Sequence, residues 1–199
     1  MNIPVIEWGV ASVPMPGQSQ SGDRYVVHPS PNGVMVAAID GIGHGQEAAR
    51  AADRAATILT KYAQESMIGL VKRCHDQLRE TRGVVLSLAV INEVEGDLTW
   101  MGVGNVEGVV VRAAASANPR KESLLLRGGV VGHQLPSLYA SIIPIARGDT
   151  LILVTDGVHS NFADSVNVTD RPQLVADRII AEYSKGSDDA LVLVARYLK

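Results

Sequence analysis

Short apolar runs, separated by glycine, proline and polar residues, dominate the chain and predict a protein rich in β-strands. The clearest run, Val34–Ile39, is apolar at every position, which is typical of a strand buried on both faces. The segment Glu95-Gly96-Asp97 between two other runs is a compact hairpin signal. The remaining predicted strands are Val5–Val13, Tyr25–His28, Val84–Val94, Leu98–Val103, Val106–Ala113, Glu122–Leu126, Ala140–Ile145, Thr150–Thr155 and Leu191–Tyr197.

Three segments have helical periodicity instead. Gln46–Gln64 places its alanines and Leu59 three and four residues apart, so one face is apolar and small enough to pack closely. Ser66 is a candidate N-cap for a second helix, in a region that ends at Gly83. A third helix is predicted over Arg171–Tyr183, capped by Asp170 and with a proline in its first turn.

This order of elements predicts an α+β fold. The strands follow one another in hairpin-connected runs, which favours two mainly antiparallel sheets. Two helices between early and late strands, and a third near the end, fit an αββα four-layer sandwich with helices outside two packed sheets. The length of 199 residues predicts a single domain over residues 1–199.

Composition narrows the function. The net charge of −3 argues against a nucleic-acid partner, which would need a basic face to neutralise phosphates. No apolar stretch reaches the ~18 residues of a membrane span, so we expect no membrane partner. Cys74 is the only cysteine, so it cannot form an internal disulfide, and this fits a cytoplasmic protein.

The candidate chemistry lies in aspartates at predicted strand ends. Asp40 and Asp156 each end a strand and are each followed by glycine. The pair Asp188-Asp189 precedes the last strand, and Asp23 precedes an early one. Each aspartate alone is more typical of a turn or a cap, but several carboxylates at one rim would repel each other unless a hard cation neutralised them. Carboxylate, carbonyl and water oxygens suit Mg²⁺ and Mn²⁺, so the joint pattern indicates a metal site.

A glycine-rich nucleotide loop is the main alternative for Asp40–Gly45, because this segment joins a strand to a helix. The dinucleotide pattern would need glycine at position 46, where the chain has Gln46. The next segment is another helix and not a returning parallel strand, so the loop does not fit that class.

With these motifs the chain resembles the PPM-type metal-dependent serine/threonine protein phosphatases, in particular their compact bacterial branch. The matching pieces occur in family order over about residues 8–198: Ser21-Gly22-Asp23, Asp40-Gly41-Ile42-Gly43-His44-Gly45, Gly102-Val103-Gly104-Asn105, Thr155-Asp156-Gly157 and Asp188-Asp189-Ala190. The resemblance implies the αββα fold. It also implies hydrolysis of phosphoserine or phosphothreonine by metal-activated water, on phosphorylated STAS-domain scaffold proteins of the stressosome, by an enzyme we expect to be a monomer.

The resemblance also assigns roles to residues, around two Mn²⁺ or Mg²⁺ ions. Asp40 would bridge the two ions and Gly41 would supply a carbonyl. Asp156 and Asp188 would complete one ion's ligands, and Asp23 would act on the other ion through water. Asp40 and Asp156 would thus act in catalysis through the metal-activated water. Asp189 matches a weaker metal position.

Three departures from the family pattern affect other roles. The stretch Pro14–Gly22, which holds a phosphate-binding arginine in larger members, has no basic residue, and Arg24 is out of register. Ile42 replaces the usual histidine, so His44 becomes the candidate general acid. Leu191 stands where Thr or Ser is usual. A phosphoprotein-binding module and a small-molecule phosphomonoesterase of the same fold remain open as alternatives.

Overall fold

The computed structural model describes residues 5–199 and contains ten strands, three α-helices and one 3-10 helix in that range. The strands are β1 (Ile6–Val13), β2 (Asp23–Ser30), β3 (Gly33–Gly41), β4 (Val84–Asn92), β5 (Asp97–Val103), β6 (Glu107–Val111), β7 (Lys121–Ser123), β8 (Ser141–Pro144), β9 (Thr150–Val154) and β10 (Ala190–Tyr197). The helices are α1 (Gln46–Lys61), α2 (Met67–Gln77), the 3-10 helix η1 (Ser160–Ser165) and α3 (Pro172–Tyr183).

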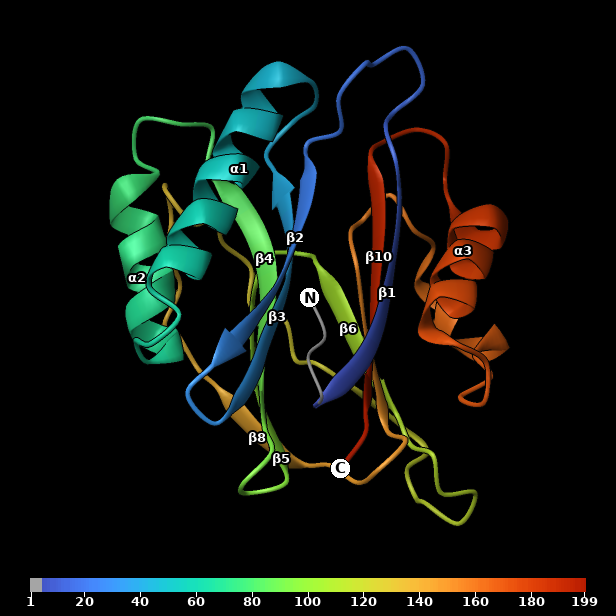
Figure 1. Ribbon diagram of the computed structural model, residues 1–199. Helices are drawn as coiled ribbons and strands as arrows, with labels where there is room; N and C mark the ends of the chain where they lie inside the picture. The colour runs from blue at the N-terminus through green and yellow to red at the C-terminus, as the bar shows by residue number, and fades with distance from the viewer. Residues whose placement is uncertain (1–4) are drawn as a thin grey trace.

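The strands form two five-stranded antiparallel sheets, in the orders β1-β10-β9-β6-β7 and β2-β3-β4-β5-β8. The sheets pack face to face, with α1 and α2 covering the outer face of one and α3 that of the other (Figure 1). This arrangement confirms the predicted αββα sandwich. Hairpins join neighbouring strands within a sheet, whereas other connections, such as β1 to β2 and β5 to β6, cross from one sheet to the other at the ends of the sandwich.

Strand β3 contributes side chains to two cores, one between the sheets and one between its own sheet and the helices α1 and α2. Its residues 34–39 are completely buried, so both faces contribute to a core, as the continuous apolar run predicts. Val34, Val36 and Ala38 belong to the core between the sheets, whereas Met35, Ala37 and Ile39 pack under α1 and α2. A third cluster lies between α3 and its sheet.

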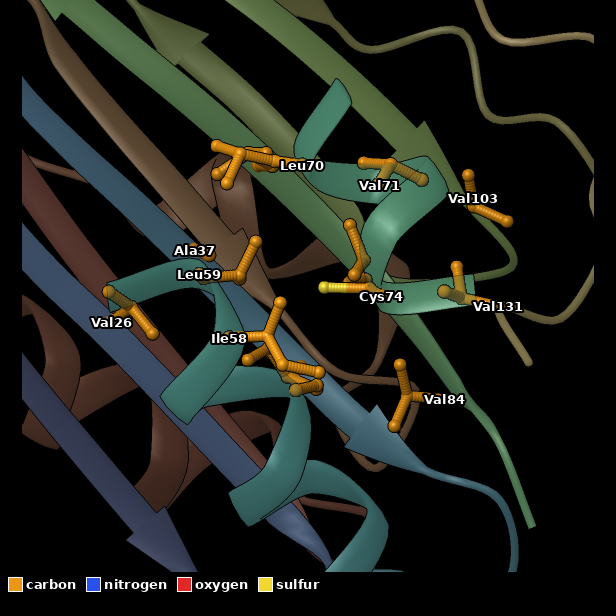
Figure 2. Packing of buried hydrophobic residues seen from close by; sticks show 14 of the residues in the cluster. Val26, Ala37, Ile58, Leu59, Leu70, Val71, Cys74, Val84, Val103 and Val131 are labelled. Atoms are coloured by element: carbon orange, nitrogen blue, oxygen red, sulfur yellow. The ribbon is translucent and has the colours of Figure 1, made fainter. Parts of the chain in front are cut away.

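The core under α1 and α2 is built from small and branched side chains (Figure 2). Leu59 of α1 and Leu70 and Cys74 of α2 are buried there, so Cys74 is a packing residue. The alanines of α1 bring its backbone close to the sheet, which sets the position of the loop that precedes the helix. Ser66 caps α2 by accepting a hydrogen bond from the Gly69 amide at 3.2 Å, as predicted.

The helix α3 begins differently from the prediction. Arg171 and not Asp170 is its N-cap, and no side chain caps its first turn. The Asp170 carboxylate instead forms an ion pair with Arg178 at 2.9 Å. Pro172 opens the helix as expected, because it needs no backbone donor in the first turn. The short helix η1 was not predicted, and β7 covers only the beginning of the strand expected over Glu122–Leu126.

Candidate active site

The candidate aspartates meet at one end of the sandwich. Strand register places Asp23 at the start of β2 directly opposite Asp40 near the end of β3. Asp156 follows the end of β9, and Asp188 lies just before β10 in the other sheet. Burial raises the pKa of both Asp23 and Asp40, and the negative charges of Asp156 and Asp188 add to the rise, so the carboxylates adjoining the two sheets act on one another across the rim.

Asp23 is the most enclosed of these groups, with 4% of its surface exposed. Its Oδ2 accepts a hydrogen bond from the Thr155 hydroxyl at 2.7 Å, while its Oδ1 is buried without a hydrogen-bond partner. Burial raises the pKa of Asp23 to about 7; the Thr155 hydroxyl opposes this rise and the neighbouring carboxylates add to it. A carboxylate held in this way needs a positive charge to stay ionised.

Asp40, near the end of β3, is also a carboxylate whose ionised form is destabilised by its surroundings. Burial, followed by the charge of Asp23, raises the pKa of Asp40 to about 8. The next residue, Gly41, packs so tightly against α1 that a Cβ would lie 2.1 Å from the Ala48 carbonyl oxygen. Glycine is therefore required here by packing, which explains one of the two Asp-Gly pairs.

Asp156 is held from two directions. The Asn105 side chain, from the turn between β5 and β6, donates to its Oδ2 at 2.8 Å. The Lys185 ammonium donates to its backbone carbonyl at 2.6 Å. Burial and then the charge of Asp188 raise the pKa of Asp156, whereas Lys185 and Asn105 lower it. In the second Asp-Gly pair, a Cβ on Gly157 would lie 1.9 Å from the Asp189 carbonyl oxygen.

Asp189 is built into the scaffold. Its two oxygens accept hydrogen bonds from the backbone amides of Met15 and Gly22, each at 2.7 Å. These bonds tie both ends of the loop between β1 and β2 to the start of β10. The metal role of Asp189 stays a prediction, and the geometry shows in addition that this carboxylate fixes the loop before Asp23.

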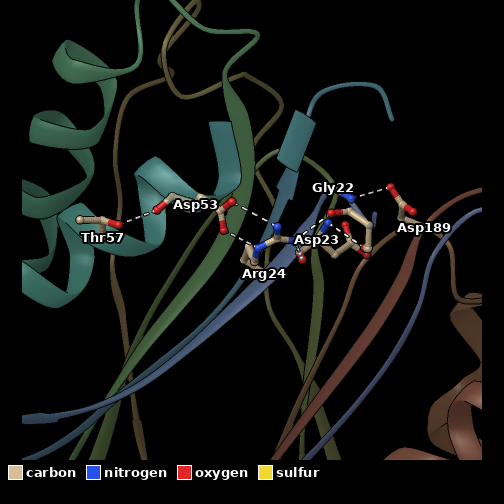
Figure 3. A network of polar contacts seen from close by, with 7 residues as sticks. Gly22, Asp23, Arg24, Asp53, Thr57 and Asp189 are labelled. Atoms are coloured by element: carbon tan, nitrogen blue, oxygen red, sulfur yellow. Dashed lines mark hydrogen bonds and ion pairs between the residues drawn. The ribbon is translucent and has the colours of Figure 1, made fainter. Parts of the chain in front are cut away.

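The candidate general acid His44 and the out-of-register Arg24 lie differently. His44 is exposed in the loop between β3 and α1. Arg24 is engaged within the scaffold: it forms an ion pair with Asp53 of α1 at 2.5 Å and donates to the carbonyls of Ser21 and Asp23, each at 2.8 Å (Figure 3). Arg24 therefore anchors β2 to α1, in agreement with its position out of register for phosphate binding.

The residues at the rim fit a hard divalent cation in their chemistry. The unpartnered Oδ1 of Asp23, the mutual repulsion of the carboxylates and the all-oxygen donor set favour Mg²⁺ or Mn²⁺ over softer metals. Within residues 5–199, no three His, Cys, Asp or Glu side chains are drawn together as a closed metal-binding set. The ligand roles of Asp23, Asp40, Gly41, Asp156 and Asp188 therefore stay predictions.

The fold is that of the PPM-type protein serine/threonine phosphatases. Residues 30–198 match the family described as Stage II sporulation protein E (SpoIIE), and the chain belongs to that family. Across residues 5–199, no helix is both long and apolar enough to cross a bilayer.

Several relatives are similar over most of their length. The phosphoserine phosphatase RsbX of Bacillus subtilis (strain 168) is 26% identical over 147 residues, which are 72% of this chain and 70% of RsbX. A structure from the bacterial stressosome, a modular system adapted to control secondary messenger signalling, has a TM-score of 0.87 at 27% identity, covering 96% of this chain and 99% of its own. RsbX in complex with magnesium has the same fold, with a TM-score of 0.84 at 20% identity and coverages of 99% and 98%.

Sequence reasoning missed the residues that hold the aspartates in place. Thr155 links the two sheets, because its hydroxyl donates to Asp23 and accepts from the Leu191 amide at 2.8 Å. In the sequence Asn105 stands out only as the last residue of a family motif. A polar residue directly before Asp156 was the one available signal for Thr155, whereas the pairing of Asn105 with Asp156 depends on tertiary structure.

Proposed function

We propose that this protein is a Mn²⁺- or Mg²⁺-dependent phosphatase that removes phosphate from phosphoserine or phosphothreonine of STAS-domain proteins in a stressosome. The carboxylate rim supports the metal requirement, since four mutually repelling aspartates face one another at the end of the sandwich. The stressosome relative and RsbX support the substrate class.

Two cations would be held by Asp23, Asp40, Asp156, Asp188 and the Gly41 carbonyl. When bound, such ions lower the pKa of a water molecule and neutralise charge on phosphoryl oxygens. The chain's own residues orient the ligands: Thr155 fixes Asp23 and Asn105 fixes Asp156. His44 is the proposed proton donor to the leaving serine or threonine oxygen.

The deciding assay measures phosphate release from a phosphorylated STAS-domain protein and from free phosphoserine, with Mn²⁺ and with excess EDTA. We expect turnover of the phosphoprotein that requires the metal and exceeds turnover of free phosphoserine. Equal turnover of both substrates would indicate a small-molecule phosphomonoesterase. Turnover that persists in EDTA would contradict the metal centre, and tight phosphoprotein binding without turnover would indicate a binding module.

A further inference from the structure

The aspartate rim has no assigned group to hold the anionic part of a substrate. The loop Pro14–Gly22 has no basic residue, and Arg24 is bound on all sides by Asp53 and two carbonyls (Figure 3). Lys185 is also engaged, since its ammonium donates to the Asp156 carbonyl. A cation that is close to the rim and weakly held must therefore come from another element.

Arg82 meets both conditions. Arg82 lies just before β4. The carbonyl of the next residue, Gly83, accepts a hydrogen bond from the Ile42 amide at 3.1 Å, so Arg82 lies beside the loop that follows Asp40. The Arg82 side chain reaches onto that loop: a Cβ on Gly43 would lie 2.6 Å from its Nη1. Gly43 also has a φ of +89°, so a side chain is disfavoured there both by backbone conformation and by the guanidinium.

The guanidinium of Arg82 faces a groove. The groove has a volume of about 550 Å³ and is lined by Ile42, Glu47, Arg50, Arg82 and His133 among others. We call it the Arg82 groove. One of its lining residues, Ile42, directly follows the candidate ligand Gly41, so the groove adjoins the loop that leaves the rim.

The present partner of Arg82 can be exchanged. Arg82 pairs with Glu47 in the first turn of α1 at 2.5 Å, and the two side chains are 47% and 64% exposed. Ion pairs this exposed contribute little free energy, because water screens them. A phosphate or carboxylate of a substrate presents two oxygens to the planar guanidinium and can replace the single carboxylate of Glu47.

We propose that Arg82 is a substrate-binding residue, which releases Glu47 and binds an anionic group of the phosphorylated substrate in the Arg82 groove. The inference rests on the proposed hydrolysis of a phosphomonoester. The anion is either the phosphoryl group itself or a carboxylate that flanks the phosphorylated residue, and both require the same free guanidinium.

The test compares Arg82→Ala, Arg82→Lys and Glu47→Gln with the wild type at saturating Mn²⁺. The substrates are para-nitrophenyl phosphate and two phosphopeptides that differ only in having acidic or amide residues beside the phosphoserine. We expect Arg82→Ala to raise KM about ten- to a hundredfold with a smaller change in kcat, and Arg82→Lys to restore part of the loss. An effect on all substrates assigns the phosphoryl group, and an effect on the acidic peptide alone assigns the flanking carboxylate.

Glu47→Gln should change KM in the opposite direction to Arg82→Ala. If Glu47 only stabilises the fold by pairing with Arg82, both single substitutions should impair the enzyme. If Glu47 competes with the substrate, Glu47→Gln should lower KM, because it frees the guanidinium. The matched control is Arg79→Ala, which breaks the exposed Arg79–Asp76 pair of the same segment outside the groove. Thermal unfolding checks that each variant is folded.

Binding of inorganic phosphate to the Mn²⁺-loaded proteins, measured by calorimetry, separates this inference from the proposed function. If the wild type hydrolyses none of the substrates, the proposed function fails, and weaker phosphate binding by Arg82→Ala still supports the anion site. If Arg82→Ala equals Arg79→Ala both in KM for every substrate and in phosphate affinity, Arg82 does not bind substrate and the inference is overturned.

Discussion

Replacing Asp40 by asparagine tests the role of the aspartate rim, because the substitution should stabilise the metal-free protein but impair metal binding and turnover. Without metal, the Asp40 carboxylate is destabilising: burial and the charge of Asp23 raise its pKa from 3.8 to about 8. At about 1.4 kcal/mol per pKa unit, this change bounds the cost of ionising Asp40 in the folded protein at about 6 kcal/mol. Because neighbouring carboxylates can take up a proton in its place, we expect Asp40→Asn to stabilise the metal-free protein at pH 8 by about 2 kcal/mol.

With metal, the same substitution should be damaging. Asparagine keeps the shape of the side chain but loses the charge and the oxygen proposed to bridge the ions, so Mn²⁺ should no longer raise the melting temperature as we expect it to do in the wild type. Turnover should fall by at least ~10³-fold, about 4 kcal/mol of transition-state stabilisation. The assays are thermal unfolding at pH 8 with and without Mn²⁺, where 2 kcal/mol corresponds to about 4–8 °C, and steady-state kinetics over a Mn²⁺ titration.

Asp97→Asn is the matched control. Asp97 begins β5 at the opposite end of the same sheet, since it pairs with Asn92, which in turn pairs with Gly33 at the other end of β3 from Asp40. This substitution should leave both the metal response and turnover unchanged. A folded Asp40→Asn protein with near-normal turnover at saturating Mn²⁺ would show that Asp40 is a turn residue and that the active site lies elsewhere.

Three further results are expected. Thr155→Val removes the hydroxyl bonded to Asp23 and should cost about 1–3 kcal/mol and weaken Mn²⁺ binding, whereas Thr155→Ser should retain both; equal behaviour of the two variants would deny the hydroxyl its role. The raised pKa values of Asp23 and Asp40 mean that these groups contribute most to the stability of the metal-free protein below pH 3.8. The melting temperature of the metal-free protein should therefore fall as the pH rises from 5.5 to 8.5, and saturating Mn²⁺ should reverse this trend. A melting temperature that does not change with pH in the absence of metal would contradict the repulsion between the buried carboxylates. His44→Ala should lower kcat about 10²-fold and change the pH–rate profile, and an unchanged profile would show that His44 is not the proton donor.

Much of the fold could be predicted because periodicity and burial coincide in this chain. The run Val34–Ile39 is apolar throughout, and it forms the strand with both faces buried. The ends of helices and strands were less predictable, since they depend on which of several partners a side chain binds. Asp170 is a good N-cap by residue type, but Arg178, about two turns into α3, binds its carboxylate. The 3-10 helix η1 has no periodic signal, because six residues are too short for one.

The residue types of the candidate site could be predicted from the sequence, but the hydrogen bonds that hold these residues in place could not. Strand ends gave Asp40 and Asp156, because aspartate followed by glycine is rarely found inside a sheet. The contacts from Asn105 to Asp156 and from Asp189 to the loop before Asp23 join residues that are far apart in sequence, so no local pattern could show them. The ligand assignments themselves stay predictions until metal binding is measured.

The division of the rim between the two sheets has a consequence for folding kinetics. Asp23 and Asp40 belong to one sheet, while Asp156 and Asp188 adjoin strands of the other, so each sheet alone carries only half of the crowded charge. The full repulsion, and any complete set of ligands, arises only when the sheets dock. A cation that binds this set would therefore leave the speed of folding almost unchanged and would act on the rate of escape from the native state, so that the lifetime of the folded enzyme follows the supply of divalent metal.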